Sequence, residues 1–155
     1  MSEDFATKPS RKKSALLAIA VGGGIAGTLD LLQACLLFGW KIPLVISAGL
    51  LGRGALHGGV STYVLGVLLH FFIACSAAAT YYAASRRLHF LIEHPLVCGL
   101  FFGAAVQEVM NLVVLPLSAL QSRGPYKLDD LILGLLVHMV VIGLPISFSV
   151  RRFAN

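Results

Sequence analysis

Four long apolar runs, separated by short polar segments, organise this chain. They cover about 14–38, 60–85, 95–118 and 128–150, and each exceeds the roughly 20 residues that an α-helix needs to cross a bilayer. The pattern therefore predicts an all-α membrane protein with four transmembrane helices in a single domain over 14–152. Residues 1–13 are polar and end in a basic cluster, which predicts a disordered cytoplasmic tail.

The segment between the first two runs has its own apolar stretch, from Pro43 to Gly54. It is too short to span a bilayer and too apolar for an ordinary loop, so it predicts a short re-entrant or interfacial half-helix. Arg53 and His57 lie at its end among several glycines and form a candidate loop site. The simpler interpretation is an interface anchor and a solvated histidine, since no phosphate-loop pattern is present.

Composition and charge agree with a membrane location. Hydrophobic residues make up 57% of the chain and charged residues only 12%, against about 25% charged in soluble domains. The net charge is +5, but the basic residues cluster at the ends of the runs, which favours anionic lipid head groups as partners and argues against nucleic acid. Eight Lys and Arg residues lie on the side of the two termini and four on the other, so we expect both termini in the cytoplasm.

A cleavable leader ending at Cys35 is the competing interpretation of the first run. Asp30 inside the run and Gln33 in the position of a processing site both argue against it. The other two cysteines, Cys75 and Cys98, also lie in apolar runs. The three show no metal-type spacing, and their odd number implies no disulfide framework.

Four ionisable residues lie near the centres of the runs: Asp30, His70, Glu108 and His138. At 1.5 Å per residue they fall within about 6 Å of one plane. Each costs about 2.5–3.5 kcal/mol at a bilayer centre. We therefore predict that all four face the interior of the bundle and pair there, as a candidate midplane polar site.

The positions of these residues repeat along the chain. Gly66 precedes His70 by four residues, as Gly134 precedes His138, and each preceding run has an acid followed three residues later by an amide, Gln33 or Asn111. The repeat predicts two tandem parallel hairpins related by an axis along the membrane normal. The amides Gln33, Gln107 and Asn111 would then support the polar site.

Three interpretations of the polar site stay open. The favoured one is structural: the acids and histidines bond across helices and fix their packing. A second is proton-coupled transport or an ion pathway, for which a homodimer is expected because four spans are few. A third is binding of a haem between His70 and His138, with Gly66 and Gly134 leaving room for it, or of a single metal ion. The favoured interpretation requires no cofactor, and no nucleophile–base arrangement suggests an enzyme.

Three stretches resemble those of uncharacterised four-span bacterial inner-membrane proteins. They are Leu69-His70-Phe71-Phe72-Ile73-Ala74, Tyr81-Tyr82-Ala83-Ala84-Ser85-Arg86-Arg87 and Met110-Asn111-Leu112-Val113-Val114-Leu115-Pro116-Leu117-Ser118. The resemblance covers most of the chain after the tail. It implies a helical fold in a bacterial cytoplasmic membrane and brings no assigned activity or binding residues.

Overall fold

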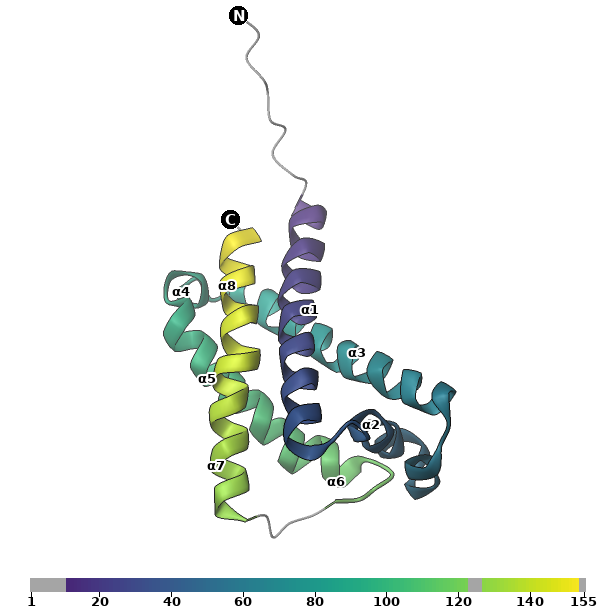
Figure 1. The fold of residues 1–155 in the computed structure, drawn as a ribbon. Helices are drawn as coiled ribbons and strands as arrows, with labels where there is room; N and C mark the ends of the chain where they lie inside the picture. The colour runs from purple at the N-terminus through teal and green to yellow at the C-terminus, as the bar shows by residue number, and fades with distance from the viewer. Residues whose placement is uncertain (1–10, 123–126, 154–155) are drawn as a thin grey trace, which may run out of the picture.

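The computed structural model describes residues 11–122 and 127–153, and within these ranges every regular element is a helix (Figure 1). Four helical stretches are long and apolar enough to cross a membrane, which confirms the four predicted spans: Lys12–Phe38, Val60–Ser85, Pro95–Leu117 and Leu128–Phe153. The first helix already begins at Arg11, inside the segment expected to be a disordered tail. Lys and Arg are good helix formers, and their side chains can extend from a span into the head-group region. Residues 1–10 of that tail lie outside the described residues.

The elements follow one another without a strand in the described ranges. They are α1 (Arg11–Phe38), α2 (Ile42–Leu51), the 3₁₀ turn η1 (Arg53–His57), α3 (Val60–Ser85), α4 (Phe90–Glu93), α5 (Pro95–Val109), the π-helical η2 (Met110–Val114), α6 (Leu115–Leu117), α7 (Leu128–Val137), the π-helical η3 (His138–Gly143) and α8 (Leu144–Phe153).

Helix α1 is the centre of the packing. It contacts α3 on one side and α8 with η3 on another, while α5 packs against η3 and α8. Figure 1 shows α1 running beside the α7–α8 stretch in the opposite direction, so that the start of α1 and the end of α8 lie at the same end of the molecule. Helices α3 and α5 have few contacts with each other apart from an edge-to-face ring pair, Tyr81 with Phe102, whose centroids are 4.9 Å apart.

Small residues make the close contacts between spans, as expected where packing has little help from the hydrophobic effect. A Cβ atom at Gly23 would lie 2.8 Å from the Cα of Cys75 in α3. On α5, a Cβ at Gly99 or Gly103 would overlap the η3–α8 stretch at Ser147 or at the carbonyl of His138. Glycine at these positions lets the helices approach closely, because any larger side chain would overlap the neighbouring helix.

The two π-helical turns each come just before a proline. In η2 the N–H of Leu115 donates to the carbonyl of Met110, five residues earlier, and Pro116 follows. In the fourth span η3 ends at Gly143, two residues before Pro145. Proline has no N–H and its ring crowds the carbonyl four residues back, so a wider turn before it relieves the clash. The wider turn before Pro145 begins at His138.

Helix α2 is held on two sides. The Ser47 hydroxyl donates to the carbonyl of Thr62 at 2.6 Å, and the N–H of Ala119 donates to the carbonyl of Gly49 at 2.7 Å. Where α2 crosses α3, a Cβ at Gly66 would overlap the carbonyl of Pro43. The short apolar helix therefore lies against both α3 and the segment that follows α6.

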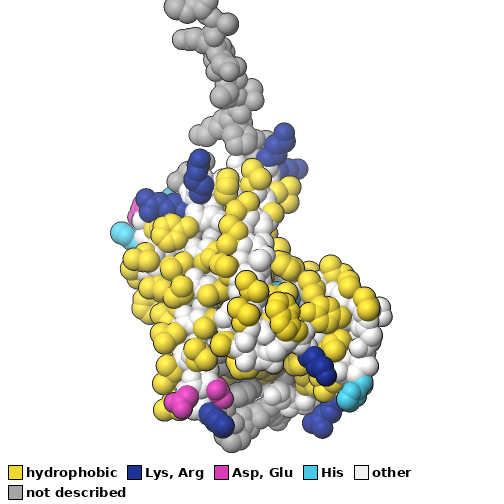
Figure 2. All heavy atoms as spheres, viewed as in Figure 1, with side chains coloured by type: hydrophobic (Ala, Val, Ile, Leu, Met, Phe, Trp, Pro, Cys, Tyr) yellow, Lys and Arg dark blue, Asp and Glu magenta, His cyan; other side chains and the backbone are white. Residues whose placement is uncertain are grey.

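The surface is mostly apolar. In Figure 2 hydrophobic side chains cover the middle of the visible face, and charged side chains gather towards its two ends. Large apolar residues on all four spans are exposed, among them Leu36, Phe72, Phe101 and Leu136. A soluble protein would bury such side chains, whereas a lipid-facing surface exposes them.

Candidate functional site

The divergence of α3 and α5 beyond the Tyr81–Phe102 pair leaves a cavity of about 520 Å³, here called the α3–α5 groove. Its walls come from α3 and from the α5–η2–α6 stretch, with α2 at one end and α1 and η3 at its base. The lining is apolar except for a few side chains. Those able to bond a ligand are Asp30, His70, Ser118 and His138.

The groove opens on the apolar surface of the molecule. Several of its lining residues are strongly exposed, including Phe72 at 70% and Leu117 at 81%. Among the residues that the structure describes, no Lys or Arg lines it. A molecule entering between these side chains would come from the side of the bundle that lipid covers if the spans cross a membrane.

Asp30 and His70 lie together at the base of the groove. The Nε2 atom of His70 is 2.8 Å from the carbonyl oxygen of Gly27, so this nitrogen carries the hydrogen and donates it. The nearer Asp30 carboxylate oxygen is 3.9 Å from Nε2, too far for a hydrogen bond. The two side chains are only 13% and 15% exposed. The predicted acid–histidine neighbourhood is therefore present, but the histidine bonds the backbone of α1 and not the acid.

His138 reaches the same groove from η3. Its Nδ1 atom is 2.9 Å from the carbonyl oxygen of Gly134, one turn earlier in the same helix, so Nδ1 carries the hydrogen and donates it. The opposite nitrogen, Nε2, is left to accept a proton or a hydrogen bond. The two histidines of the sequence repeat thus donate from different ring nitrogens, His70 from Nε2 and His138 from Nδ1.

Glu108 does not join the other three. Its side chain is exposed on α5, and it lines none of the described cavities. The expectation that all four ionisable residues face the interior is wrong for this one. The reason is that α5 packs against η3 and α8 through Gly99 and Gly103, which lie on another face of that helix.

The three amides gather in a second cavity of about 340 Å³, here called the polar chamber. Its polar lining residues are Gln33, Gln107, Asn111, Asp130 and His138. His138 and Leu115 line both cavities, and His138 is the polar side chain of the two. The amides therefore share a cavity with His138, and they do not line the groove that holds Asp30 and His70.

The candidate loop site stays apart from both cavities. Arg53 and His57 are the first and last residues of η1, and both side chains are exposed. They line neither the groove nor the chamber. Their positions agree with the simpler interpretation of an interface anchor and a solvated histidine.

The space expected for a haem is already filled. A Cβ at Gly66 would overlap the carbonyl of Pro43, and a Cβ at Gly134 would lie 2.5 Å from the Gln107 amide nitrogen. The two glycines are thus packing positions for α2 and for Gln107. Within residues 11–122 and 127–153, no three His, Cys, Asp or Glu side chains come together as a metal site. The arrangement of donors and packing therefore fits neither a haem nor a metal ion.

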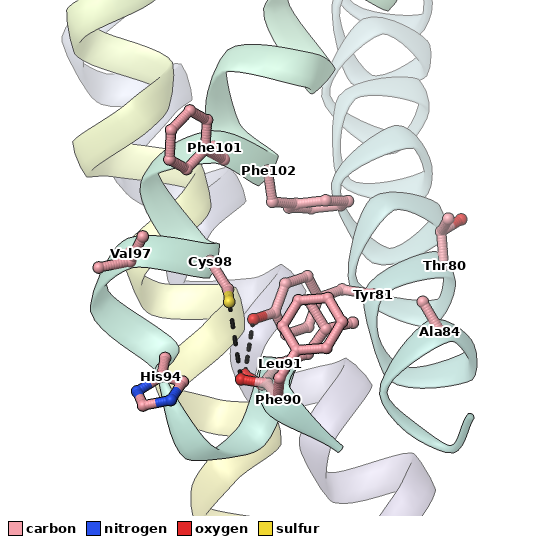
Figure 3. A pocket seen from close by; sticks show the side chains of 10 residues that line it. All are labelled: Thr80, Tyr81, Ala84, Phe90, Leu91, His94, Val97, Cys98, Phe101 and Phe102. Atoms are coloured by element: carbon pink, nitrogen blue, oxygen red, sulfur yellow. Dashed lines mark hydrogen bonds between the residues drawn. The ribbon is translucent and has the colours of Figure 1, made fainter. Parts of the chain in front are cut away.

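A third cavity was not anticipated from the sequence. Figure 3 shows its lining side chains, which come from α3 and from the α4–α5 segment. The cavity has a volume of about 630 Å³ and an almost wholly apolar lining. The hydroxyl of Tyr81 donates to the carbonyl of Leu91 at 2.9 Å and so fixes α4 against α3. The thiol of Cys98 lies 3.6 Å from the carbonyl of Phe90. Tyr81 is 1% exposed and lines this cavity, but it does not line the α3–α5 groove.

The fold and surface define a class: a helical protein with four stretches that can cross a membrane. Comparison with protein-family models, with curated proteins and with solved structures finds no match for this chain. The geometry of the groove and the chamber is thus the basis for a proposed function.

Proposed function

We propose that this membrane protein binds a lipid-soluble small molecule in the α3–α5 groove, with Asp30 and His70 contacting the polar group of that molecule. The carboxyl group of Asp30 carries the proposal. It is only 15% exposed, it lines the groove, and its 3.9 Å contact with His70 Nε2 is too long for a hydrogen bond. A buried carboxyl without a partner is costly, and a ligand that donates a hydrogen bond would remove that cost.

The size and lining of the groove support the same conclusion. Small-molecule sites measure about 300–1,000 Å³ and combine apolar walls with a few placed polar groups. The groove has about 520 Å³, and its polar side chains are confined to a small part of the lining. Its exposed apolar rim favours a ligand that is dissolved in the bilayer over one that arrives from water.

The helix-pairing role that we favoured from the sequence is supported for His70 alone. Its bond to the Gly27 carbonyl joins α3 to α1 and fixes their register. That bond gives no role to Asp30, and it leaves the other ring nitrogen of His70 available. Transport through all four ionisable residues has less support, because Glu108 lies outside the groove.

We also propose the finer organisation that the sequence predicts. The contacts of α1 with α3, and of α5 with η3 and α8, support two tandem hairpins. The position of α2 at the end of the groove supports a half-helix that enters the membrane. The basic residues at the shared end of α1 and α8 favour cytoplasmic termini, anionic lipid contacts and, with the resemblance described above, a bacterial inner membrane.

The proposal is tested by purifying the protein in mild detergent and measuring what it retains. Native mass spectrometry gives the mass of any bound molecule, and mass spectrometry of the organic extract identifies its class. We expect about one apolar molecule per chain in the unmodified protein. Asp30→Asn should raise the Kd about tenfold or more and so lower the retained amount, since one hydrogen bond to a charged group contributes roughly 1.5–3 kcal/mol.

Glu108→Gln is the matched control, because it makes the same kind of change at the exposed acid. It should retain the molecule as the unmodified protein does. Ala77→Leu, which places a larger side chain in the groove wall, should exclude the molecule without touching the acid. Retention that is equal in all three variants, or no retained molecule at all, would leave the groove as a packing defect and overturn the proposal.

A further inference from the structure

The polar chamber differs from the groove in its chemistry and in its position. It lies between the end of α1, the α5–η2 junction and α7, and three amides, a carboxyl and an imidazole line it. Gln107 is buried and Gln33 and Asn111 are half-buried, and amides in such apolar surroundings are costly unless they are bonded. Their convergence on one cavity therefore calls for an occupant that forms hydrogen bonds.

The Asn111 side chain has a hydrogen-bond donor that no described residue of the protein satisfies. Its Nδ2 atom is fully buried and has no hydrogen-bond partner among the described residues. An unsatisfied donor of this kind costs about 1–3 kcal/mol. The chamber of about 340 Å³ that Asn111 lines is far larger than the roughly 15 Å³ that one water molecule requires. Water is the simplest partner that fits both the orphaned donor and the volume.

The lining continues from one end of the bundle to its middle. Asp130 lies in the first turn of α7 with an exposed side chain, and His138 follows eight residues later on the same span. Eight residues of helix correspond to about 12 Å. The chamber therefore extends from the end of the molecule that carries residues 127–130 to the level of His138.

His138 is placed to receive a proton from this chamber. Its Nδ1–H is engaged with the Gly134 carbonyl, so the Nε2 lone pair is the group that can accept. The titratable side chains that line the two cavities beside it are Asp130 on the chamber side and Asp30 with His70 on the groove side. A proton that reaches His138 from water is then at the wall of the groove.

We propose that the polar chamber is filled with water and gives His138, and through it the α3–α5 groove, proton access to the aqueous phase at the residue 127–130 end. This inference does not depend on whether the groove holds a ligand. It predicts that water extends from the residue 127–130 end of the molecule as far as His138 and that the apolar groove lies beyond it.

Water access is tested with cysteine substitutions in sealed vesicles. The background has Cys35, Cys75 and Cys98 replaced by alanine, and the probe is a charged, membrane-impermeant thiosulfonate applied to either side. Val137→Cys lies in the chamber wall, and its neighbour Leu136→Cys, 56% exposed on the apolar surface, is the matched control at the same depth. We expect Val137→Cys to react from the 127–130 side at least tenfold faster than Leu136→Cys.

Two results would overturn the hydrated chamber. Equal inertness of the two cysteines would mean a dry cavity, and equal reactivity would mean that α7 does not lie in lipid. Asn111→Leu in the Val137→Cys protein provides a second test, since loss of the amide should dry the chamber and slow the reaction several-fold.

Proton access is measured separately, by ¹⁵N NMR of ring-labelled histidine in the same vesicles. The His138 resonance is identified by its absence in His138→Gln. It should respond to the pH of the solution on the 127–130 side, and this response should be lost or slowed in Asn111→Leu. A His138 signal that ignores pH on that side in the unmodified protein would refute the proton path even if water enters.

Discussion

At the scale of the residue, equivalent positions in the sequence repeat have different surroundings in the structure. Asp30 lines the groove beside His70, whereas Glu108 is exposed. His70 donates to the backbone of another helix, whereas His138 donates to its own. The periodicity places such residues at similar depths, but it cannot tell which face meets another helix and which meets lipid, since both surroundings are apolar.

The hydrogen bond between His70 and Gly27 gives a prediction for stability. His70→Ala should lower the free energy of unfolding by about 1 kcal/mol, because interhelical hydrogen bonds in membrane proteins contribute roughly 0.6–2 kcal/mol. The measurement is unfolding in mixed detergent micelles, followed by circular dichroism.

His57→Ala, at an exposed histidine outside the spans, is the control and should leave stability unchanged. Asp30→Asn should have a smaller effect than His70→Ala, since the carboxyl lies 3.9 Å from the ring and makes no hydrogen bond to it. A loss in Asp30→Asn that exceeds the loss in His70→Ala would contradict this assignment of roles.

At the scale of the element, glycines and prolines determine how the helices meet. Gly23, Gly99 and Gly103 permit close contact between spans, while Pro116 and Pro145 each follow a π-helical turn. Wider turns of this kind often occur at functional sites. Here one of them begins at His138, which lies between the groove and the chamber.

Gly66 carries the element-scale prediction. A methyl group there would overlap the carbonyl of Pro43, so Gly66→Ala should displace α2 from α3 and destabilise the protein by about 1–3 kcal/mol. Thermal unfolding in detergent measures the effect. Gly24→Ala is the matched control, because a Cβ at Gly24 would meet nothing within 4 Å.

We expect Gly24→Ala to be neutral or slightly stabilising, in line with the better helix propensity of alanine. Because α2 closes one end of the groove, Gly66→Ala should also weaken retention of the bound molecule. An unchanged unfolding temperature in Gly66→Ala would show that α2 is not held against α3 in the membrane.

At the scale of the whole molecule, the arrangement is asymmetric. Helix α1 is flanked on two sides, by α3 and by α8, whereas α3 and α5 diverge from each other. The groove is a consequence of this divergence, since it lies between α3 and the α5–η2–α6 stretch. The chamber lies instead between α1, the α5–η2 junction and α7. The Tyr81–Phe102 pair closes the gap at one end only.

Orientation is the prediction that belongs to this scale. Reporter fusions should show residues 86–94 and the C-terminus in the cytoplasm and residues 39–41 on the opposite side, because the Lys and Arg count is eight against four. A fluorescent protein that folds only in the cytoplasm, and an enzyme that is active only outside it, give complementary readouts at each position.

Replacing Arg86 and Arg87 together by Ser should weaken this bias and produce a mixed orientation. The matched control is replacement of Lys41 and Arg53 by Ser, which removes two charges from the opposite side and should strengthen the bias. If the unmodified protein instead shows residues 39–41 in the cytoplasm and residues 86–94 outside it, the predicted orientation is wrong. The chamber would then open on the cytoplasmic side.

The sequence was enough to predict the helical class and the four spans, whose bounds agree with the structure to within three residues. These features are set by run length and apolar content, which act locally. It also identified Asp30, His70 and His138, which share the groove, because ionisable residues stand out in an apolar run. The sequence did not reveal that Glu108 is exposed, that the three amides line one cavity with His138, or that Tyr81 is buried. These features depend on which faces of the helices pack together. An apolar face can be covered by another helix or by lipid, and its residue types are similar in both cases, so the sequence does not tell the two apart.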